Sequence, residues 1–162
     1  MLIIMDRFQR LILTTIGAVV LAVCFSTSFV NAQNFEKKVI SSPDAPEAIG
    51  PYSQAIQVGK TVYLSGQGPI DPKTQQIAPD ASIEDQTRRV LDNLKAVLVA
   101  AGLTMDHIVA TTVYLKDVSE FAKMNMVYAT YFKSAPPARA TVEVARLPRD
   151  AKIAISAIAV AP

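Results

Sequence analysis

Arg139 is the residue whose type and position best suit chemistry in this chain. It follows the rigid segment 136–138 (Pro-Pro-Ala) at the start of a predicted strand, a position that can aim a guanidinium into a cleft. The planar fork of a guanidinium binds a carboxylate through two parallel hydrogen bonds. The alternative is an exposed arginine that pairs with an acid such as Glu143. Residue type alone leaves both interpretations open.

Other chemistries lack the residues that they need. The 162 residues include one cysteine, Cys24, and one histidine, His107. A structural zinc site needs several Cys or His ligands, and the chain has no H-E-x-x-H or G-x-S-x-G motif. His107 follows Asp106 in a predicted loop, where a solvated side chain is expected. The sequence therefore predicts no metal site.

Tyr52 and two glycines are weaker candidates for a binding site. Tyr52 lies in a tight loop at residues 50–53, where a core aromatic and a pocket wall fit the sequence equally well. Gly66 and Gly68 have no G-x-G-x-x-G continuation, so a loop explains them better than phosphate binding does. The net charge of +2 at pH 7 gives no electrostatic footprint for nucleic acid.

The N-terminal segment has the features of a secretory signal peptide. Arg7 and Arg10 precede an uncharged, largely apolar stretch at residues 11–25, and small residues suited to a peptidase site follow at residues 30–32 (Val-Asn-Ala). Cleavage is expected directly before Gln33.

Cleavage there makes residues 1–32 a signal peptide and residues 33–162 one domain that is periplasmic or secreted and free of the membrane. The competing interpretation is an uncleaved anchor, because residues 11–30 carry no charge and are just long enough to span a bilayer. A lipoprotein modified at Cys24 fits less well, since Val23 stands where Gly, Ala or Ser is expected. A mature chain without thiols suits an oxidising compartment.

Apolar periodicity predicts an order of three strands, a helix, a strand, a helix and two strands. A Gly59-Lys60 turn of type II′ is expected between the second and third strands. One helix begins at Ser82 and ends before Gly102, and the other begins near Asp117 or Ser119. The predicted strands cover residues 39–40, 54–58, 61–65, 108–115, 138–147 and 152–160.

This order gives two strand–helix–strand crossovers, and right-handed crossovers place both helices on one face of a single sheet. The other face is then uncovered and is either a subunit interface or a half-solvated surface. On the last two strands, Val142, Val144, Ile153, Ile155 and Ala157 are expected to face the helices. Arg139, Thr141, Glu143, Lys152, Ala154, Ser156, Ile158 and Val160 are expected on the opposite face.

Three segments of the chain resemble the RidA/YjgF family of reactive-intermediate deaminases. They are A-I-G-P-Y-S-Q-A at residues 48–55, Y-L-S-G-Q at residues 63–67 and P-A-R-A-T-V-E-V-A-R-L-P at residues 137–148. The likeness extends from about Val39 to Val160. It implies a chorismate-mutase-like α+β fold, a homotrimer with clefts between subunits, and no cofactor. It also implies hydrolysis of reactive 2-imino acids to 2-oxo acids and ammonia.

The resemblance also assigns site residues in this sequence. The substrate-binding arginine of the family corresponds to Arg139, its pocket tyrosine to Tyr52 and its helix-borne asparagine to Asn125. Backbone groups at Gly66 and Thr141 correspond to positions that shape the site and hold the substrate carboxylate. Arg139 is then both the catalytic and the principal substrate-binding residue.

The final strand departs from the family pattern. Family members with established imine hydrolysis usually carry a run of the form I-E-I-E-A, whereas residues 153–157 read I-A-I-S-A. Ala154 therefore replaces the glutamate thought to orient the attacking water, and Ser156 replaces the next acid. Pro136 also replaces a phenylalanine that often precedes Pro-Ala-Arg. The alternative function is a trimeric protein on the same fold that binds small carboxylates or protects unfolded clients without turnover.

Overall fold

The computed structural model describes residues 36–162 of the chain. The predicted signal peptide and its cleavage site lie outside this range, so they stay predictions. Within residues 36–162, no helix is long and apolar enough to cross a bilayer.

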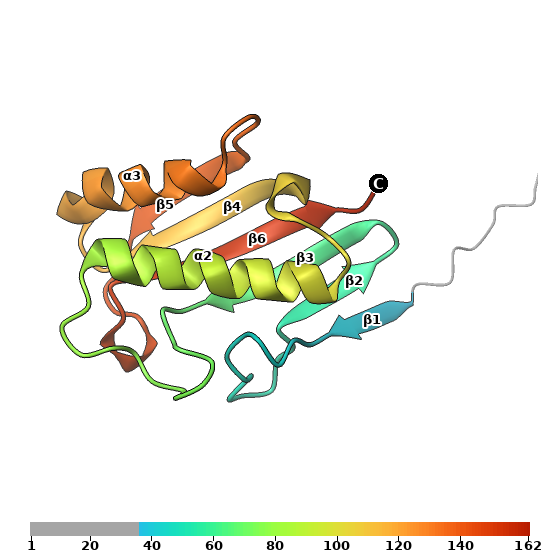
Figure 1. Cartoon of the computed structure of the whole chain (residues 1–162), viewed down its shortest axis with the longest axis horizontal. Coiled ribbons are helices and arrows are strands. Elements are labelled where there is room, and N and C mark those ends of the chain that lie inside the picture. The colour runs from blue at the N-terminus through green and yellow to red at the C-terminus, as the bar shows by residue number, and fades with distance from the viewer. Residues whose placement is uncertain (1–35) are drawn as a thin grey trace, which may run out of the picture. The chain divides into compact units, whose positions relative to one another are not determined.

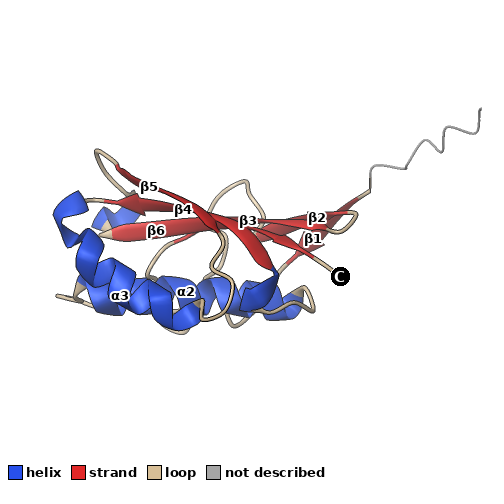
Figure 2. Cartoon of the chain, turned by 90° about the horizontal axis from the view of Figure 1, so that it is seen from above, coloured by secondary structure: helices blue, strands red, loops and turns tan. Residues whose placement is uncertain are grey.

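Residues 36–162 form one six-stranded mixed sheet with two α-helices on one of its faces (Figures 1 and 2). The strand order is β1-β2-β3-β6-β4-β5, and β4 and β5 are the parallel pair. The predicted α+β architecture is confirmed. The strands are β1 (Lys37–Ile40), β2 (Ala55–Val58), β3 (Thr61–Gln67), β4 (Ile108–Leu115), β5 (Ala138–Glu143) and β6 (Ile153–Val160), and the α-helices are α2 (Ile83–Ala100) and α3 (Phe121–Tyr131).

Local sequence signals explain where these elements begin and end. In the β2–β3 turn Gly59 has a φ of 57° and Lys60 has a negative φ, which is the combination that a type II′ turn requires. Ser82 caps α2, because its Oγ accepts a hydrogen bond from the Asp85 N–H at 3.1 Å. Gly102, with a φ of 75°, ends the helix in a left-handed conformation that glycine adopts without strain.

The second helix begins in two steps. Asp117 caps the short 3₁₀ helix η2 (Val118–Glu120) by accepting a hydrogen bond from the Ser119 N–H at 2.8 Å, and α3 follows directly. Met124 and Tyr128 of α3 are buried, whereas Phe121 is 38% exposed at the start of the helix.

The hydrophobic core forms between the middle of the sheet and α2. β6 lies between β3 and β4, and its Ile153 and Ile155 side chains are completely buried. Each fully buried aliphatic side chain contributes about 1.5–3 kcal/mol, so this layer is a main source of stability. On α2 the completely buried side chains are Val90, Leu91, Leu94, Val97 and Leu98.

The sidedness of β5 corrects the sequence prediction. Arg139 is in register with Thr111 of β4, which is buried beneath the helices. Residues paired in register share a face, so the Arg139 side chain lies on the helix side. Val142 lies on the opposite face, where it is 43% exposed. The prediction that Val142 faces the helices is therefore wrong, and so is the prediction that Arg139, Thr141 and Glu143 lie on the opposite face.

The position of β5 at the sheet edge explains this reversal. Polar side chains are tolerated on the helix side of the edge because they can bond to the ends of the neighbouring elements. The Glu143 carboxylate, for example, accepts a hydrogen bond from the Val118 N–H at 2.9 Å. β5 also ends at Glu143 rather than at Leu147, because β4 ends at Leu115 and the Val144 N–H already donates to the Leu115 carbonyl at 2.9 Å.

The face of the sheet opposite the helices carries an apolar surface. Ala154 lies on this face, as predicted, because it alternates with the buried Ile153 and Ile155 and pairs with Tyr114. Large exposed apolar patches are characteristic of surfaces that associate with other molecules. The large apolar residues of this face that stay more than a third exposed are Val39, Tyr63, Val142, Ile158 and Val160.

Gln54 holds the loop that precedes β2. Its Oε1 accepts a hydrogen bond from the Ser42 N–H at 2.6 Å, and its Nε2 donates to the carbonyls of Ser42 at 3.1 Å and Pro46 at 2.7 Å. The Gln54 side chain is buried, and its amide is the shared hydrogen-bond partner of these backbone groups. Buried polar groups need such partners because water does not reach them. This amide thereby fixes the loop that carries Tyr52.

Gln54→Ala is expected to lower the free energy of unfolding by about 2–4 kcal/mol, because it leaves several buried backbone groups unsatisfied. Urea unfolding at one fixed protein concentration measures this change. Gln57→Ala on the adjoining strand β2 is the matched control, since the Gln57 side chain makes one exposed hydrogen bond to the Gly59 carbonyl. Equal stability of the two variants would contradict this role of Gln54.

Candidate functional site

The Arg139 guanidinium lies over two aromatic rings of α3. Its central carbon is 4.5 Å from the centroid of the Tyr128 ring and 5.6 Å from that of Phe121. A cation within about 6 Å of an aromatic face is attracted by the negative potential of the ring. The rings therefore limit the positions of a long side chain and leave its in-plane N–H groups available to a ligand.

Tyr128 is itself held from two sides. Its hydroxyl and the Thr111 Oγ1 are 2.8 Å apart and hydrogen-bonded, and its ring centroid is 4.6 Å from that of Phe132. Burial raises the pKa of the Tyr128 phenol above its usual value, although the bond to Thr111 and the charge of Arg139 act in the opposite direction. The phenol is therefore neutral at physiological pH, and the platform beneath Arg139 carries no charge.

Asn125 and Thr141 belong to the same region. Asn125 lies on α3 between Phe121 and Tyr128, at the i+4 spacing that shares a helix face with Phe121. Thr141 is two residues from Arg139 on β5 and lies on the same side of the strand. The Thr141 Oγ1 is buried and has no hydrogen-bond partner within the described part of the chain. Arg139, Asn125 and Thr141 form the first group of predicted site residues.

The interpretation that Arg139 pairs with Glu143 is not supported. The Glu143 carboxylate accepts its hydrogen bond from the Val118 N–H instead. The ion pairs among residues 36–162 include none between Arg139 and Glu143. The guanidinium therefore keeps its hydrogen-bonding capacity for another carboxylate.

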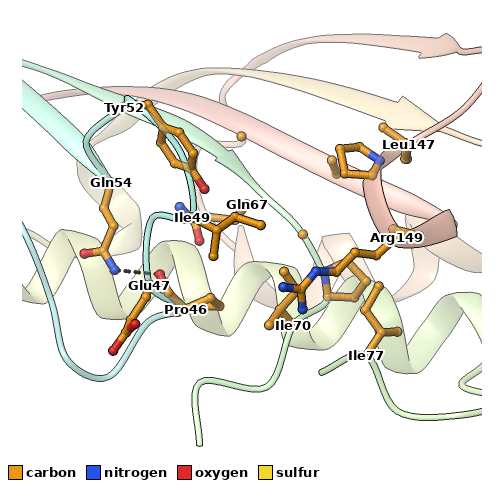
Figure 3. Close-up of a pocket in the computed structure, with 16 residues that line it drawn as sticks. Pro46, Glu47, Ile49, Tyr52, Gln54, Gln67, Ile70, Ile77, Leu147 and Arg149 are labelled. Carbon is orange, nitrogen blue, oxygen red and sulfur yellow. Dashed lines mark hydrogen bonds between the residues drawn. The ribbon is translucent and has the colours of Figure 1, made fainter. Parts of the chain in front are cut away.

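Tyr52, Gly66 and Ala154 form the second group, and they line one pocket with a cavity volume of about 220 Å³ (Figure 3). Three loops that lie far apart in the sequence close this pocket. Tyr52 is 50% exposed and lies at the pocket, so it is a pocket wall rather than a core aromatic. The other lining residues are Pro46, Glu47, Ile49, Gln54, Gln67, Gly68, Pro69, Ile70, Ile77, Leu147, Pro148, Arg149 and Ala151.

The two groups lie on different sides of the sheet. Arg139 is on the helix side, whereas Ala154 is on the opposite side. Arg139, Asn125 and Thr141 are absent from the lining of the pocket. One copy of the domain therefore does not bring the predicted site residues together.

Sequence reasoning did not find two parts of this arrangement. It gave Tyr128 no role beneath Arg139. One signal was available in the sequence. Phe121 and Tyr128 are seven residues apart on a helix, so they share a helix face, and the next strand carries Arg139. The pocket walls Ile70, Ile77 and Leu147 come from separate loops, and no local sequence pattern connects them.

Residues 36–162 contain no group of three or more His, Cys, Asp or Glu side chains that could hold a metal ion. The described titratable groups with shifted pKa values are not among the residues that line the pocket. Backbone hydrogen bonds from Lys73 and Thr74, with the nearby Arg89, lower the pKa of Asp71, and the Lys116 ammonium lowers that of Asp150. These shifts have structural causes.

Residues 42–161 match the family described as endoribonuclease L-PSP. A RutC family protein of Pyrococcus horikoshii is 55% identical over 123 residues, which are 76% of this chain and 97% of that protein. The 2-iminobutanoate/2-iminopropanoate deaminase of Salmonella typhimurium is 50% identical over 126 residues, which are 76% of this chain and 97% of the deaminase.

The chain belongs to the RidA/YjgF (endoribonuclease L-PSP) family. The crystal structure of the Escherichia coli YjgF gene product, 48% identical, has a TM-score of 0.73, and the match covers 76% of this chain and 98% of that one. The crystal structure of E. coli TdcF with bound serine is 44% identical and has a TM-score of 0.74. That match covers 77% of this chain and 99% of the TdcF chain. The RidA/YjgF resemblance inferred from the three sequence segments is thus confirmed.

Two threonines of this RidA/YjgF domain provide a paired test of the geometry around Arg139. Thr141→Val is expected to leave the free energy of unfolding unchanged or to raise it by up to about 1 kcal/mol, because it removes a buried hydroxyl without a partner. Thr111→Val is expected to lower it by about 1–3 kcal/mol, because the buried Tyr128 hydroxyl loses its bond. Thermal and urea unfolding measure both. A larger loss in Thr141→Val than in Thr111→Val would contradict this assignment.

Proposed function

We propose that this protein hydrolyses 2-imino acids to 2-oxo acids and ammonia. The observation that carries the proposal is Arg139, whose guanidinium is held over Tyr128 with no carboxylate of its own among the described residues. The names of relatives support it, since proteins 48–50% identical to this chain are 2-iminobutanoate/2-iminopropanoate deaminases.

The chemistry needs binding and positioning more than activation. Arg139 binds the substrate carboxylate through its two-pronged fork and thereby fixes the adjacent C=N group. A water molecule adds to the imine carbon, the C–N bond breaks in the tetrahedral adduct, and the products are a 2-oxo acid and ammonia. The imine carbon is already electrophilic when its nitrogen is protonated, so holding the reactants together supplies a large part of the acceleration.

Ala154 limits how the water is activated. The family glutamate would stand at this position, which lines the pocket beside Gly66 and Tyr52. Ser156, which replaces the next acid, is absent from the lining of the pocket, so we expect the proposed deaminase to be slower than relatives that carry the glutamate. The missing acid is also the observation that favours the second candidate, a protein that binds small carboxylates or protects clients without turnover.

We propose further that the complete site lies between subunits. The residues assigned to the site are divided between opposite sides of the sheet, so Arg139, Asn125 and Thr141 of one subunit would meet Tyr52 and Gly66 of the next. The apolar face around Tyr63 offers a surface for such an assembly. The family resemblance supplies the number of subunits, which is three. Sedimentation equilibrium that shows a monomer at micromolar concentration would contradict this homotrimer.

Export to the periplasm or the medium is proposed on the N-terminal motif alone. The mature protein is expected to begin at or close to Gln33 and to be free of the membrane, with a small molecule rather than nucleic acid as its partner. Intact-mass measurement of the exported protein tests the cleavage site. Recovery of the whole chain in the membrane fraction would instead support the uncleaved anchor.

Arg139→Ala is expected to lower kcat/KM for imine hydrolysis at least about tenfold, because a hydrogen-bonded pair with a charged group contributes roughly 1.5–3 kcal/mol. Arg139→Lys is expected to restore part of this loss, since an ammonium cannot present a planar fork. The assay generates imines with an amino-acid oxidase and follows their decay. Wild-type rates in Arg139→Ala would refute the assigned role, and a wild type that binds 2-oxobutanoate but hydrolyses no imine would favour the second candidate.

Mixing two inactive variants tests whether the site is shared. Gly66→Leu fills the pocket without a backbone clash, since no atom lies within 4 Å of a Cβ built there. When Gly66→Leu and Arg139→Ala subunits are unfolded, mixed equally and refolded, about one quarter of the sites combine an intact Arg139 with an intact Gly66. Recovery of about one quarter of wild-type activity is expected. No recovery from mixed assemblies of the correct mass would place the whole site in one subunit.

A further inference from the structure

We infer that the pocket beside Gly66 and Ala154 receives the substrate side chain, and that this side chain is large and apolar, branched or aromatic. The inference rests on the proposed function and specifies its substrate. The resemblance assigns Tyr52 and Gly66 to the site but gives no role to the chamber that extends beyond them (Figure 3).

Most of the residues that line this chamber are aliphatic or proline. Ile49, Ile70, Ile77 and Leu147 line it, and prolines supply much of the remaining surface. Its volume is about 220 Å³, whereas an aliphatic cavity of about 150 Å³ in another protein holds benzene. The methyl group of an alanine-derived imine would leave most of this space unused, whereas a leucine or phenylalanine side chain would fill it.

Two small residues create the space. Ala154 stands where the family usually has a glutamate, so the substitution that removes an acid also removes its volume. Gly68 contributes no side chain, and a Cβ built on it would meet only the Ile70 side chain, at 3.9 Å. The pocket therefore has room next to the position where the imine carbon would be held.

The pocket is formed before a ligand arrives, because Gln75 ties its three loops together. The Gln75 Oε1 accepts a hydrogen bond from the Glu47 N–H at 3.3 Å, and its backbone carbonyl accepts one from the Arg149 guanidinium. Asp150 anchors the third loop through two hydrogen bonds of 2.8 Å from the Lys116 ammonium. A preformed apolar cavity does not have to be ordered by its ligand, which favours binding.

Charged groups at the pocket do not favour a second carboxylate on the substrate. The Arg149 guanidinium donates to the Gln75 carbonyl, and the Glu47 carboxylate among the lining residues would repel a second carboxylate on the substrate. Aliphatic residues and prolines make up most of the other residues that line the pocket. The apolar substrates are therefore preferred over glutamate-derived imines.

The test compares imines generated from alanine, leucine, phenylalanine and glutamate. Each additional buried methylene is worth about fourfold in affinity, so kcat/KM for the leucine imine is expected to exceed that for the alanine imine at least about tenfold. Gly68→Leu fills the chamber and is expected to reduce this ratio to about one, with Gly68→Ala intermediate. Val99→Leu, an exposed position on α2, is the control and is expected to keep the wild-type ratio.

The outcomes separate this inference from the proposed function. Hydrolysis of the alanine imine without preference for leucine, or with preference for glutamate, would overturn the inference and leave the proposed function standing. If no imine is hydrolysed, the proposed function fails. The inference about the pocket is then tested by calorimetry, which measures the affinity of the protein for 2-oxo acids. Tighter binding of 4-methyl-2-oxopentanoate than of pyruvate, lost in Gly68→Leu, would support the apolar pocket, and equal or absent binding would overturn it.

Discussion

The insertion of β6 between β3 and β4 is the constraint on which the rest of the structure depends. The final strand completes the centre of the sheet, and its alternating side chains separate the two faces. Ile153 and Ile155 face α2, where their side chains are completely buried. Ala154 is then forced to the opposite face, and the register of β4 against β6 and β5 fixes the side on which Arg139 lies.

This alternation explains why the site residues are divided. A strand cannot present neighbouring residues to the same face, and a one-residue slip would move every buried isoleucine into solvent. A site that uses Ala154 and Arg139 together therefore needs two copies of the sheet, or a movement that would break the core. The proposed assembly through the apolar face would satisfy this need, and that face would gain burial in the process.

The two halves of the proposed site use different physical means. The Arg139 guanidinium lies over the Tyr128 ring, and Thr111 holds that ring through a hydrogen bond to the Tyr128 hydroxyl. This support positions the positive charge without neutralising it. The pocket depends on shape, because loops tied at Gln75 hold aliphatic walls in place. Orientation of the carboxylate by one half and enclosure of the side chain by the other would position the imine carbon without a glutamate at position 154.

The sequence by itself determined the elements and the family. The Gly59 turn, the Ser82 cap and the isoleucine alternation of β6 are local signals that act within a few residues, and each was confirmed. The family segments likewise identified Arg139 and Tyr52 as site candidates. Only the tertiary structure decided which face of β5 carries Arg139. Valines and charged residues alternate along this edge strand, so its sequence fits either orientation toward the helices until pairing with β4 fixes one of them. It also decided that Tyr128 supports the guanidinium and that three distant loops enclose one pocket, since contacts between residues far apart in sequence leave no periodic signal in the chain.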